Sequence, residues 1–200
     1  MNPDHPELNA CRDTLARLIA FDTVSERSNL AMIDDLATIL EAAGARVQVH
    51  SDETGEKANL FATLGPDGDG GIVLSGHTDV VPTDDQDWAT DPFEMVEKDA
   101  ALYGRGTCDM KGFLAACLVM APHFAARNLR RPLHFAFTYD EEVGCFGAQA
   151  LIKTLSRQGL RPSAAIIGEP TLMRVIDGHK GSHEYTTIIE GLAGHGSAPD

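Results

Sequence analysis

Three short apolar segments of this chain end on ionisable side chains, and this feature restricts its fold more than any other. The segments are residues 72–77, 133–139 and 164–168, and the ionisable residues at their ends are His77, Asp140, Glu141, Glu142 and Glu169. Apolar runs of this length are typical of buried strands in a sheet that helices cover. Because ligands gather at the carboxyl ends of strands in open α/β sheets, we expect these side chains to converge in space.

Segments with helical periodicity alternate with these strands. Candidate helices cover residues 8–19, 109–127 and 147–158, with another between the N-cap Ser28 and the terminating Gly44. Further candidate strands cover residues 46–50, 59–64 and 186–190, and residues 78–102 read as a long loop of the kind that is usually functional. The alternation of strands and helices predicts a layered α/β domain.

The composition argues against several classes of function. The 200 residues carry a net charge of −14, which disfavours binding to nucleic acid and to anionic membrane surfaces. No apolar run approaches the roughly 20 residues that span a bilayer, and the polar N-terminus lacks a secretory signal, so we expect a cytoplasmic protein. The cysteines form no C-x-x-C pair, and we expect them to be reduced and mostly buried. They are Cys11, Cys108, Cys117 and Cys145.

The motif His77-Thr-Asp79 combines a candidate metal ligand with a residue that can orient it. Imidazole is a common zinc ligand, and a ligating histidine usually donates its other ring N–H to a carboxylate. Side chains two residues apart on an extended chain share a face, so the Asp79 carboxylate is the candidate acceptor. The alternative for such a short motif is a hydrogen-bonded histidine without a metal.

Carboxylates supply the other candidate ligands. Glu141 and Glu142 follow a buried strand, where two adjacent charges are costly unless a cation offsets them. On extended chain their side chains diverge, so that one can bind a metal while the other acts on a nearby water. Asp109 can bridge two cations with its two oxygens, and Glu169 ends a strand. The alternatives are an acidic turn, a helix N-cap at Asp109 and a surface glutamate at position 169.

One histidine with several carboxylates suits zinc, manganese or cobalt. Two such metals roughly 3.5–4 Å apart would polarise a carbonyl and activate a water. His195, which lies between two glycines, is a candidate hydrogen-bond donor to a developing oxyanion, and the alternative is a plain loop histidine. A nucleophilic Cys108 is disfavoured because the sequence identifies no base for it.

Five short motifs follow one another along the chain. They are Ser75-Gly-His-Thr-Asp-Val-Val-Pro82, Gly104-Arg-Gly-Thr-Cys-Asp-Met-Lys-Gly112, Asp140-Glu-Glu-Val-Gly144, Gly168-Glu-Pro-Thr171 and Gly194-His-Gly-Ser-Ala-Pro199. In this order they resemble the M20 family of metallopeptidases and deacylases, over nearly all of the chain. Within that family the chain is most similar to the acetylornithine deacetylases, which the stretch 167–173 and the later Gly178-His-Lys-Gly181 support.

The resemblance implies a layered α/β zinc-peptidase-like catalytic domain with a mixed sheet over residues 1–180. A smaller α+β dimerisation domain would begin at residue 181. The family binds two divalent metal ions, which implies zinc, or cobalt, as the cofactor here. The implied metal ligands are His77 and Glu169 for one ion, Glu142 for the other and Asp109 for both.

The resemblance also implies catalytic roles. Asp79 would orient His77, and Glu141 would be the general base. His195 would stabilise the oxyanion, reaching in from the partner subunit of a homodimer. A cis peptide bond is implied between Asp109 and Met110.

The implied reaction removes the acetyl group from a small N-acyl amino acid, N-acetyl-L-ornithine, and gives L-ornithine and acetate in arginine biosynthesis. The alternatives are another M20 amidohydrolase, such as a succinyl-diaminopimelate desuccinylase or an aminoacylase, and a non-catalytic metal-binding protein. Family members have a further histidine ligand near the end of the full-length chain. We therefore expect residues 1–200 to be a fragment that is inactive alone.

Overall fold

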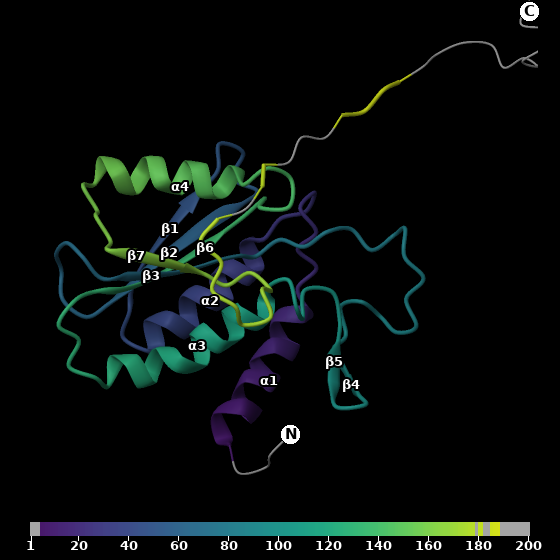
Figure 1. Cartoon of the computed structure of the whole chain (residues 1–200), viewed down its shortest axis with the longest axis horizontal. Coiled ribbons are helices and arrows are strands. Elements are labelled where there is room, and N and C mark those ends of the chain that lie inside the picture. Colours follow the sequence, from purple (N-terminus) through teal and green to yellow (C-terminus); the bar gives the residue numbers. More distant parts are fainter. Residues whose placement is uncertain (1–4, 179, 182–184, 189–200) are drawn as a thin grey trace, which may run out of the picture. The chain divides into compact units, whose positions relative to one another are not determined.

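The structure is a computed structural model that describes residues 5–178, 180–181 and 185–188. The chain divides into two compact units, Met1–Pro170 and Thr171–Asp200. Every helix and strand of the described residues lies in the first unit (Figure 1). The second unit contains a turn closed by the Thr171 hydroxyl, which donates to the Arg174 carbonyl at 2.7 Å. A domain boundary near residue 181 stays a prediction.

The first unit is built on a mixed five-stranded sheet. Its strands are β1 (Arg46–Ser51), β2 (Ala58–Leu64), β3 (Ile72–His77), β6 (Leu133–Thr138) and β7 (Ala164–Ile167), in the order β1-β2-β6-β3-β7. Strand β3 is parallel to both β6 and β7, whereas β2 is antiparallel to β1 and β6. The carboxyl ends of β3, β6 and β7 therefore lie side by side, as the sequence predicts. We call this end of the sheet the carboxyl edge. Among the described residues β7 is an edge strand, and all four of its residues are exposed.

Helices cover both faces of this sheet (Figure 1). The helices α1 (Pro6–Ile19), α2 (Leu30–Ala42) and α3 (Lys111–Ala125) lie on one face, and α4 (Phe146–Arg157) lies on the other. The larger apolar core lies under the three helices and includes Leu18, Leu36, Leu114, Phe135 and Phe137. None of the helices in the described residues is long and apolar enough to cross a membrane.

The predicted loop over residues 78–102 is only partly a loop. It contains a small hairpin of β4 (Val96–Lys98) and β5 (Ala101–Tyr103), which pair antiparallel. Each strand has three residues and buries little, so no apolar alternation marks them. The strand predicted over 186–190 is wrong for residues 186–188, which have no regular structure, and the other two residues lie outside the described part of the chain.

Each of the four predicted helices starts one or two residues away from its predicted position. The N-cap of α2 is Asn29 and not Ser28. The Asn29 side chain is buried and donates to the Ala58 carbonyl and to the Thr78 hydroxyl, both at 2.9 Å, so it ties the start of α2 to the sheet. Helix α3 begins at Lys111 rather than at Asp109. At the other end of α2, Gly44 follows the helix with φ +87°, as is expected of a glycine that terminates a helix.

The cysteines are free thiols, but the prediction that most are buried is wrong. Only Cys117 is buried, on the inner face of α3. Cys108, in the turn before α3, and Cys145, the N-cap residue of α4, are exposed, and Cys11 on α1 is half-buried.

A substitution of Gly147, at the start of α4, tests whether this helix must pack directly against the backbone after β6. A Cβ atom there would lie 2.4 Å from the Tyr139 carbonyl oxygen and 2.6 Å from the Asn59 Oδ1 atom. We predict that Gly147→Ala lowers the free energy of unfolding by about 1–3 kcal/mol, because the backbone of Tyr139 must move. Urea unfolding measures this loss. Gly178→Ala is the control, because a Cβ atom there meets nothing within 4 Å; equal stability of the two variants would contradict the prediction.

Candidate metal centre

Acidic side chains gather around the imidazole of His77 at the carboxyl edge of the sheet. His77 ends β3, whereas Glu141 and Glu142 follow β6 and Glu169 follows β7. The Nε2 atom of His77 lies 3.1 Å from Asp109 Oδ1, 3.7 Å from Glu169 Oε1 and 3.9 Å from Glu141 Oε2. The convergence expected from the strand ends is therefore confirmed.

The backbone carbonyl of Asp79 orients the imidazole of His77, and Asp79 is the residue that the sequence predicts for this role. Its side chain is 1% exposed, and Nδ1 lies 2.9 Å from the carbonyl oxygen of Asp79. A carbonyl only accepts, so Nδ1 carries a proton and donates it there, which turns Nε2 toward the acidic side chains. The expected acceptor was the Asp79 carboxylate, but its Oδ1 atom is farther from Nδ1, at 3.6 Å.

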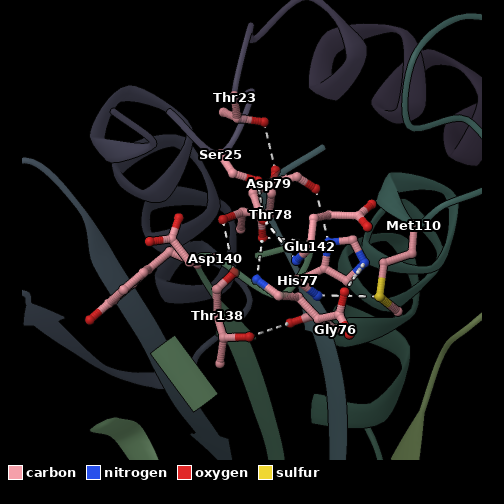
Figure 2. A network of polar contacts seen from close by, with 12 residues as sticks. Thr23, Ser25, Gly76, His77, Thr78, Asp79, Met110, Thr138, Asp140 and Glu142 are labelled. Atoms are coloured by element: carbon pink, nitrogen blue, oxygen red, sulfur yellow. Dashed lines mark hydrogen bonds and ion pairs between the residues drawn. The ribbon is translucent and has the colours of Figure 1, made fainter. Parts of the chain in front are cut away.

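The Asp79 carboxylate instead holds the turn that carries the two glutamates (Figure 2). Its Oδ1 atom accepts the backbone N–H of Glu141 at 3.0 Å, and its Oδ2 atom accepts that of Glu142 at 3.2 Å. The hydroxyl of Ser25 donates to the same Oδ2 atom at 2.6 Å. Asp79 is buried, and these donors replace the water that its charge has lost.

The segment from Thr23 to Ser25 is a part of the site that sequence reasoning missed. Val24 and Val80 form a parallel β-bridge, and the Thr23 hydroxyl donates to the Thr78 carbonyl at 2.6 Å. This segment follows α1 and lies more than 50 residues from the motif that it braces. No local pattern in the sequence marks it as part of the site.

Asp109 approaches the site from the residues just before α3. The Asp109–Met110 peptide bond is cis, as the resemblance implies. Met110 is fully buried, and its Sδ atom accepts the backbone N–H of His77 at 3.2 Å (Figure 2). A Cβ atom on Gly76 would lie 2.7 Å from Leu114 Cδ1 and 3.0 Å from Met110 Cε. A glycine at this position therefore lets the start of α3 pack directly on β3.

Lys111 anchors α1 to the same loop. Its side chain is fully buried, and its Nζ atom donates to the carbonyls of Leu18 at 3.0 Å and of Phe21 at 2.7 Å. Burial lowers the pKa of Lys111 to about 7, although the negative charge of Asp79 opposes this shift. The sequence places Lys111 in the Gly104–Gly112 motif but gives no reason to expect it beneath the end of α1.

Glu141 and Glu142 lie in a turn. The expectation that their side chains diverge assumes an extended chain, and this assumption is wrong. Residues 141–144 form the turn, and the N–H of Gly144 donates to the Glu141 carbonyl at 3.1 Å. The preceding Asp140 has φ +54°, and its carboxylate accepts a hydrogen bond from Lys57 Nζ at 2.5 Å. Asp140 therefore anchors the turn through an ion pair with Lys57, the residue just before β2, and not through the acidic group.

Burial, together with the charges of neighbouring carboxylates, raises the pKa of two of the acidic side chains. Burial and then the charge of Asp109 raise the pKa of Glu142 to about 7. Burial likewise raises the pKa of Glu169, against the opposing effect of His77. For His77, burial lowers the pKa, but the charges of Asp79, Glu169 and Glu141 outweigh it and raise the pKa overall. The negative charges repel one another, and a cation among them would relieve this repulsion.

The donor atoms at this edge fit a divalent metal. His77, Glu141 and Glu169 offer ligand atoms within 4.8 Å of one another, and so do His77, Asp109 and Glu142. One imidazole nitrogen with several carboxylate oxygens is a donor set that suits zinc, manganese and cobalt. Both groups share His77, and together they include every metal ligand that the sequence predicts. They also include Glu141, so distance alone does not separate the base from the ligands.

A mixed sheet whose carboxyl edge carries a histidine and several carboxylates is the architecture of a metallopeptidase-type domain. The profile of peptidase family M20/M25/M40 matches residues 73–187, more than half of the chain, and the chain belongs to this family. This membership confirms the family that the sequence motifs predict.

The chain is also similar to individual members. It is 42% identical over 182 residues to an acetylornithine deacetylase of Proteus mirabilis (strain HI4320), covering 90% of this chain and 46% of that protein. An acetylornithine deacetylase of Pasteurella multocida (strain Pm70) is 41% identical over 189 residues, covering 91% of this chain and 48% of that protein. The chain therefore spans about half the length of these relatives.

Solved structures share the fold. Human carnosine dipeptidase 1 matches with a TM-score of 0.65 and 27% identity, over 75% of this chain and 36% of that one. An M20 family metallo-carboxypeptidase, Sso-CP2, from Sulfolobus solfataricus matches with a TM-score of 0.69 and 21% identity, over 82% of this chain and 37% of that one. The second likeness concerns the fold alone.

The predicted oxyanion donor His195 lies outside the described residues.

We predict that Zn²⁺ or Co²⁺ raises the melting temperature of the chain by roughly 5–10 °C at about 100 times the dissociation constant. The cation binds the folded state and relieves the repulsion among the carboxylates. Differential scanning calorimetry with and without EDTA measures the shift. His77→Gln should abolish it, because both ligand groups include His77; the same shift in this variant would contradict the site.

Asp79→Asn tests whether the buried carboxylate holds the glutamates in place. One side-chain oxygen then becomes an NH₂ group, which cannot accept the N–H of Glu141 or Glu142. We predict a loss of Zn²⁺ affinity of roughly 10- to 100-fold, as is usual for groups that orient metal ligands. Isothermal titration calorimetry measures the affinity. Asp13→Asn, at a side chain that is 70% exposed, serves as the control and should leave the affinity unchanged.

Proposed function

We propose that His77, Asp109, Glu142 and Glu169 hold two divalent metal ions, zinc or cobalt, and that Glu141 acts as general base in amide hydrolysis. The observation that carries the proposal is the gathering of these side chains around His77, from the ends of three parallel strands and from the turn before α3. Membership in a peptidase family supports the hydrolysis of an amide bond. The assignment of Glu141 and Glu142 follows the order of the family motif.

The metals, when bound, supply Lewis acidity that polarises the amide carbonyl and lowers the pKa of a water. The protein supplies a positioned base. The Glu141 side chain is 36% exposed, so it reaches both solvent and the His77 ring. Its carboxylate takes a proton from the attacking water as the new C–O bond forms at the carbonyl carbon. It then gives this proton to the leaving nitrogen as the C–N bond breaks, and the products are a carboxylate and a free amine.

The substrate that we propose is N-acetyl-L-ornithine, with L-ornithine and acetate as products, in arginine biosynthesis. The support is the identity of 41–42% with proteins named acetylornithine deacetylase over nine-tenths of the chain. We further propose a homodimer in which His195 of the partner subunit donates to the oxyanion. A succinyl-diaminopimelate desuccinylase or an aminoacylase would use the same metals and the same base. These alternatives differ from the proposal in the acyl group and the amino acid.

The proposed roles of Glu141 as general base and Glu142 as metal ligand can be tested by substituting each residue. In the protein that contains this chain, Glu141→Gln should lower turnover by roughly 100- to 10,000-fold, the usual contribution of a general base, and leave metal content unchanged. Glu142→Gln should lower the metal content itself. Steady-state kinetics and metal analysis on the same preparations measure both effects. Unchanged turnover in Glu141→Gln, or loss of metal from it, would overturn the assignment.

A substrate panel tests the specificity. We expect N-acetyl-L-ornithine to be hydrolysed with a higher kcat/KM than N-succinyl-LL-diaminopimelate or N-acetyl-L-methionine. A preference for either of the latter compounds would favour the corresponding alternative. Full metal content without hydrolysis of any of the three would favour a non-catalytic metal-binding protein.

A further inference from the structure

The two carboxylate oxygens of Glu141, the proposed base, lie against different groups. Its Oε2 atom is 3.9 Å from Nε2 of His77, at the metal centre. Its Oε1 atom is 3.6 Å from the Sγ atom of Cys145. A thiol is a weak hydrogen-bond donor and an ionised carboxylate only accepts, so Cys145 donates to Glu141. One oxygen of the base is therefore held by a residue just after its own turn, while the other faces His77.

The backbone conformation of Cys145 brings the thiol to this position. Cys145 is the N-cap residue of α4 and has φ +57° and ψ +33°, a left-handed conformation that is uncommon for residues other than glycine. Its N–H donates to the Glu141 carbonyl at 3.1 Å, and its Sγ atom lies 3.8 Å from the same oxygen. The side chain makes no capping hydrogen bond to α4. The thiol is therefore directed back to Glu141 and not forward to the helix.

The thiol retains the proton that it donates. Burial, although partial, and then the charge of Glu141 raise the pKa of Cys145. The thiolate, which has no proton to give, is therefore disfavoured at neutral pH. Cys108 provides a comparison, because it is also exposed and precedes Asp109, but its side chain forms no hydrogen bond with the described residues. Contact with a carboxylate thus distinguishes Cys145 from the other exposed thiol.

We propose that Cys145 is a positioning residue, whose thiol holds Oε1 of Glu141 so that Oε2 is directed at the reacting water. The inference rests on the proposed function, because it concerns the oxygen through which the general base acts. The Glu141 side chain is 36% exposed and has several rotatable bonds, so without this contact it samples conformers in which neither oxygen faces the site. Since small displacements of a catalytic group slow a reaction, a donor that restricts Oε1 raises the rate without touching the substrate.

Steady-state kinetics of the protein that contains this chain test the role. Cys145→Ala removes the donor and should lower kcat roughly 3- to 10-fold, the contribution of one hydrogen bond, with KM and metal content unchanged. Cys145→Ser keeps a donor, and its kcat should stay within about twofold of the wild-type value. Alanine and serine meet the same left-handed backbone, so the difference between these variants measures the hydrogen bond. Cys108→Ala is the matched control and should leave kcat unchanged.

Infrared spectroscopy of the metal-free protein tests the contact itself. The S–H stretching vibration absorbs where other protein groups do not, and a hydrogen bond to a carboxylate lowers its frequency. The difference spectrum between wild type and Cys145→Ser isolates the Cys145 band, and Cys108→Ser isolates the Cys108 band in the same way. We expect the Cys145 band at the lower frequency of the two. In Glu141→Ala, which removes the acceptor, the Cys145 band should move to higher frequency, while the Cys108 band stays in place.

The two measurements separate failure of this inference from failure of the proposed function. Unchanged turnover in Glu141→Gln removes the base itself, and with it the role of Cys145, whatever the infrared band shows. A large loss of turnover in Glu141→Gln, together with a Cys145 band that does not respond to Glu141→Ala, would overturn the inference about Cys145 alone. An equal loss of kcat in Cys145→Ala and Cys145→Ser, or a rise in KM without a change in kcat, would overturn it as well.

Discussion

The buried carboxylate of Asp79 is the charge around which the metal centre is organised. A charge removed from water is costly unless donors surround it, and three donors do so here: the Ser25 hydroxyl and the backbone N–H groups of Glu141 and Glu142. These donors come from the segment after α1 and from the turn after β6, so one buried charge joins both to β3. Since two of the donors are backbone groups, the contacts with Asp79 do not use the side chains of Glu141 and Glu142.

Two lysines beside the centre are bound to other partners. Lys57 pairs with Asp140, and Lys111 donates to the carbonyls at the end of α1. The fold therefore brings negative side chains together and directs the neighbouring ammonium groups to other partners. Burial first, and then the charges of neighbouring carboxylates, raise the pKa of Glu142 and of Glu169. A divalent metal ion would offset this negative charge without requiring a further side chain at the carboxyl edge of the sheet.

Much of the fold and of the candidate site could be predicted from the sequence because the relevant signals are local. An apolar run that ends on His77 defines both a strand and the side chain at its end, and the same holds for Glu169. Contacts between distant segments could not be predicted in this way. Ser25 and Lys57 carry no local signal, because their roles depend on the packing of separate segments against Asp79 and Asp140.

The orientation of His77 shows a further limit of local reasoning. Spacing alone selected Asp79 as the acceptor for the ring N–H but could not distinguish its carboxylate from its carbonyl. The structure favours the carbonyl because the carboxylate is already bound to the turn after β6. Similarly, the three-residue strands β4 and β5 bury too little to leave a pattern in the sequence.

The exposed strand β7 has a consequence for how molecules of this chain behave together. Its side chains Ile166 and Ile167 are 51% and 64% exposed, and an edge strand offers backbone groups to any strand that comes alongside. At low ionic strength the net charge of −14 keeps the molecules apart. Salt shortens the range of that repulsion to about 10 Å at 0.1 M, so the edge that β7 forms among the described residues becomes easier for a neighbouring molecule to approach as the ionic strength rises.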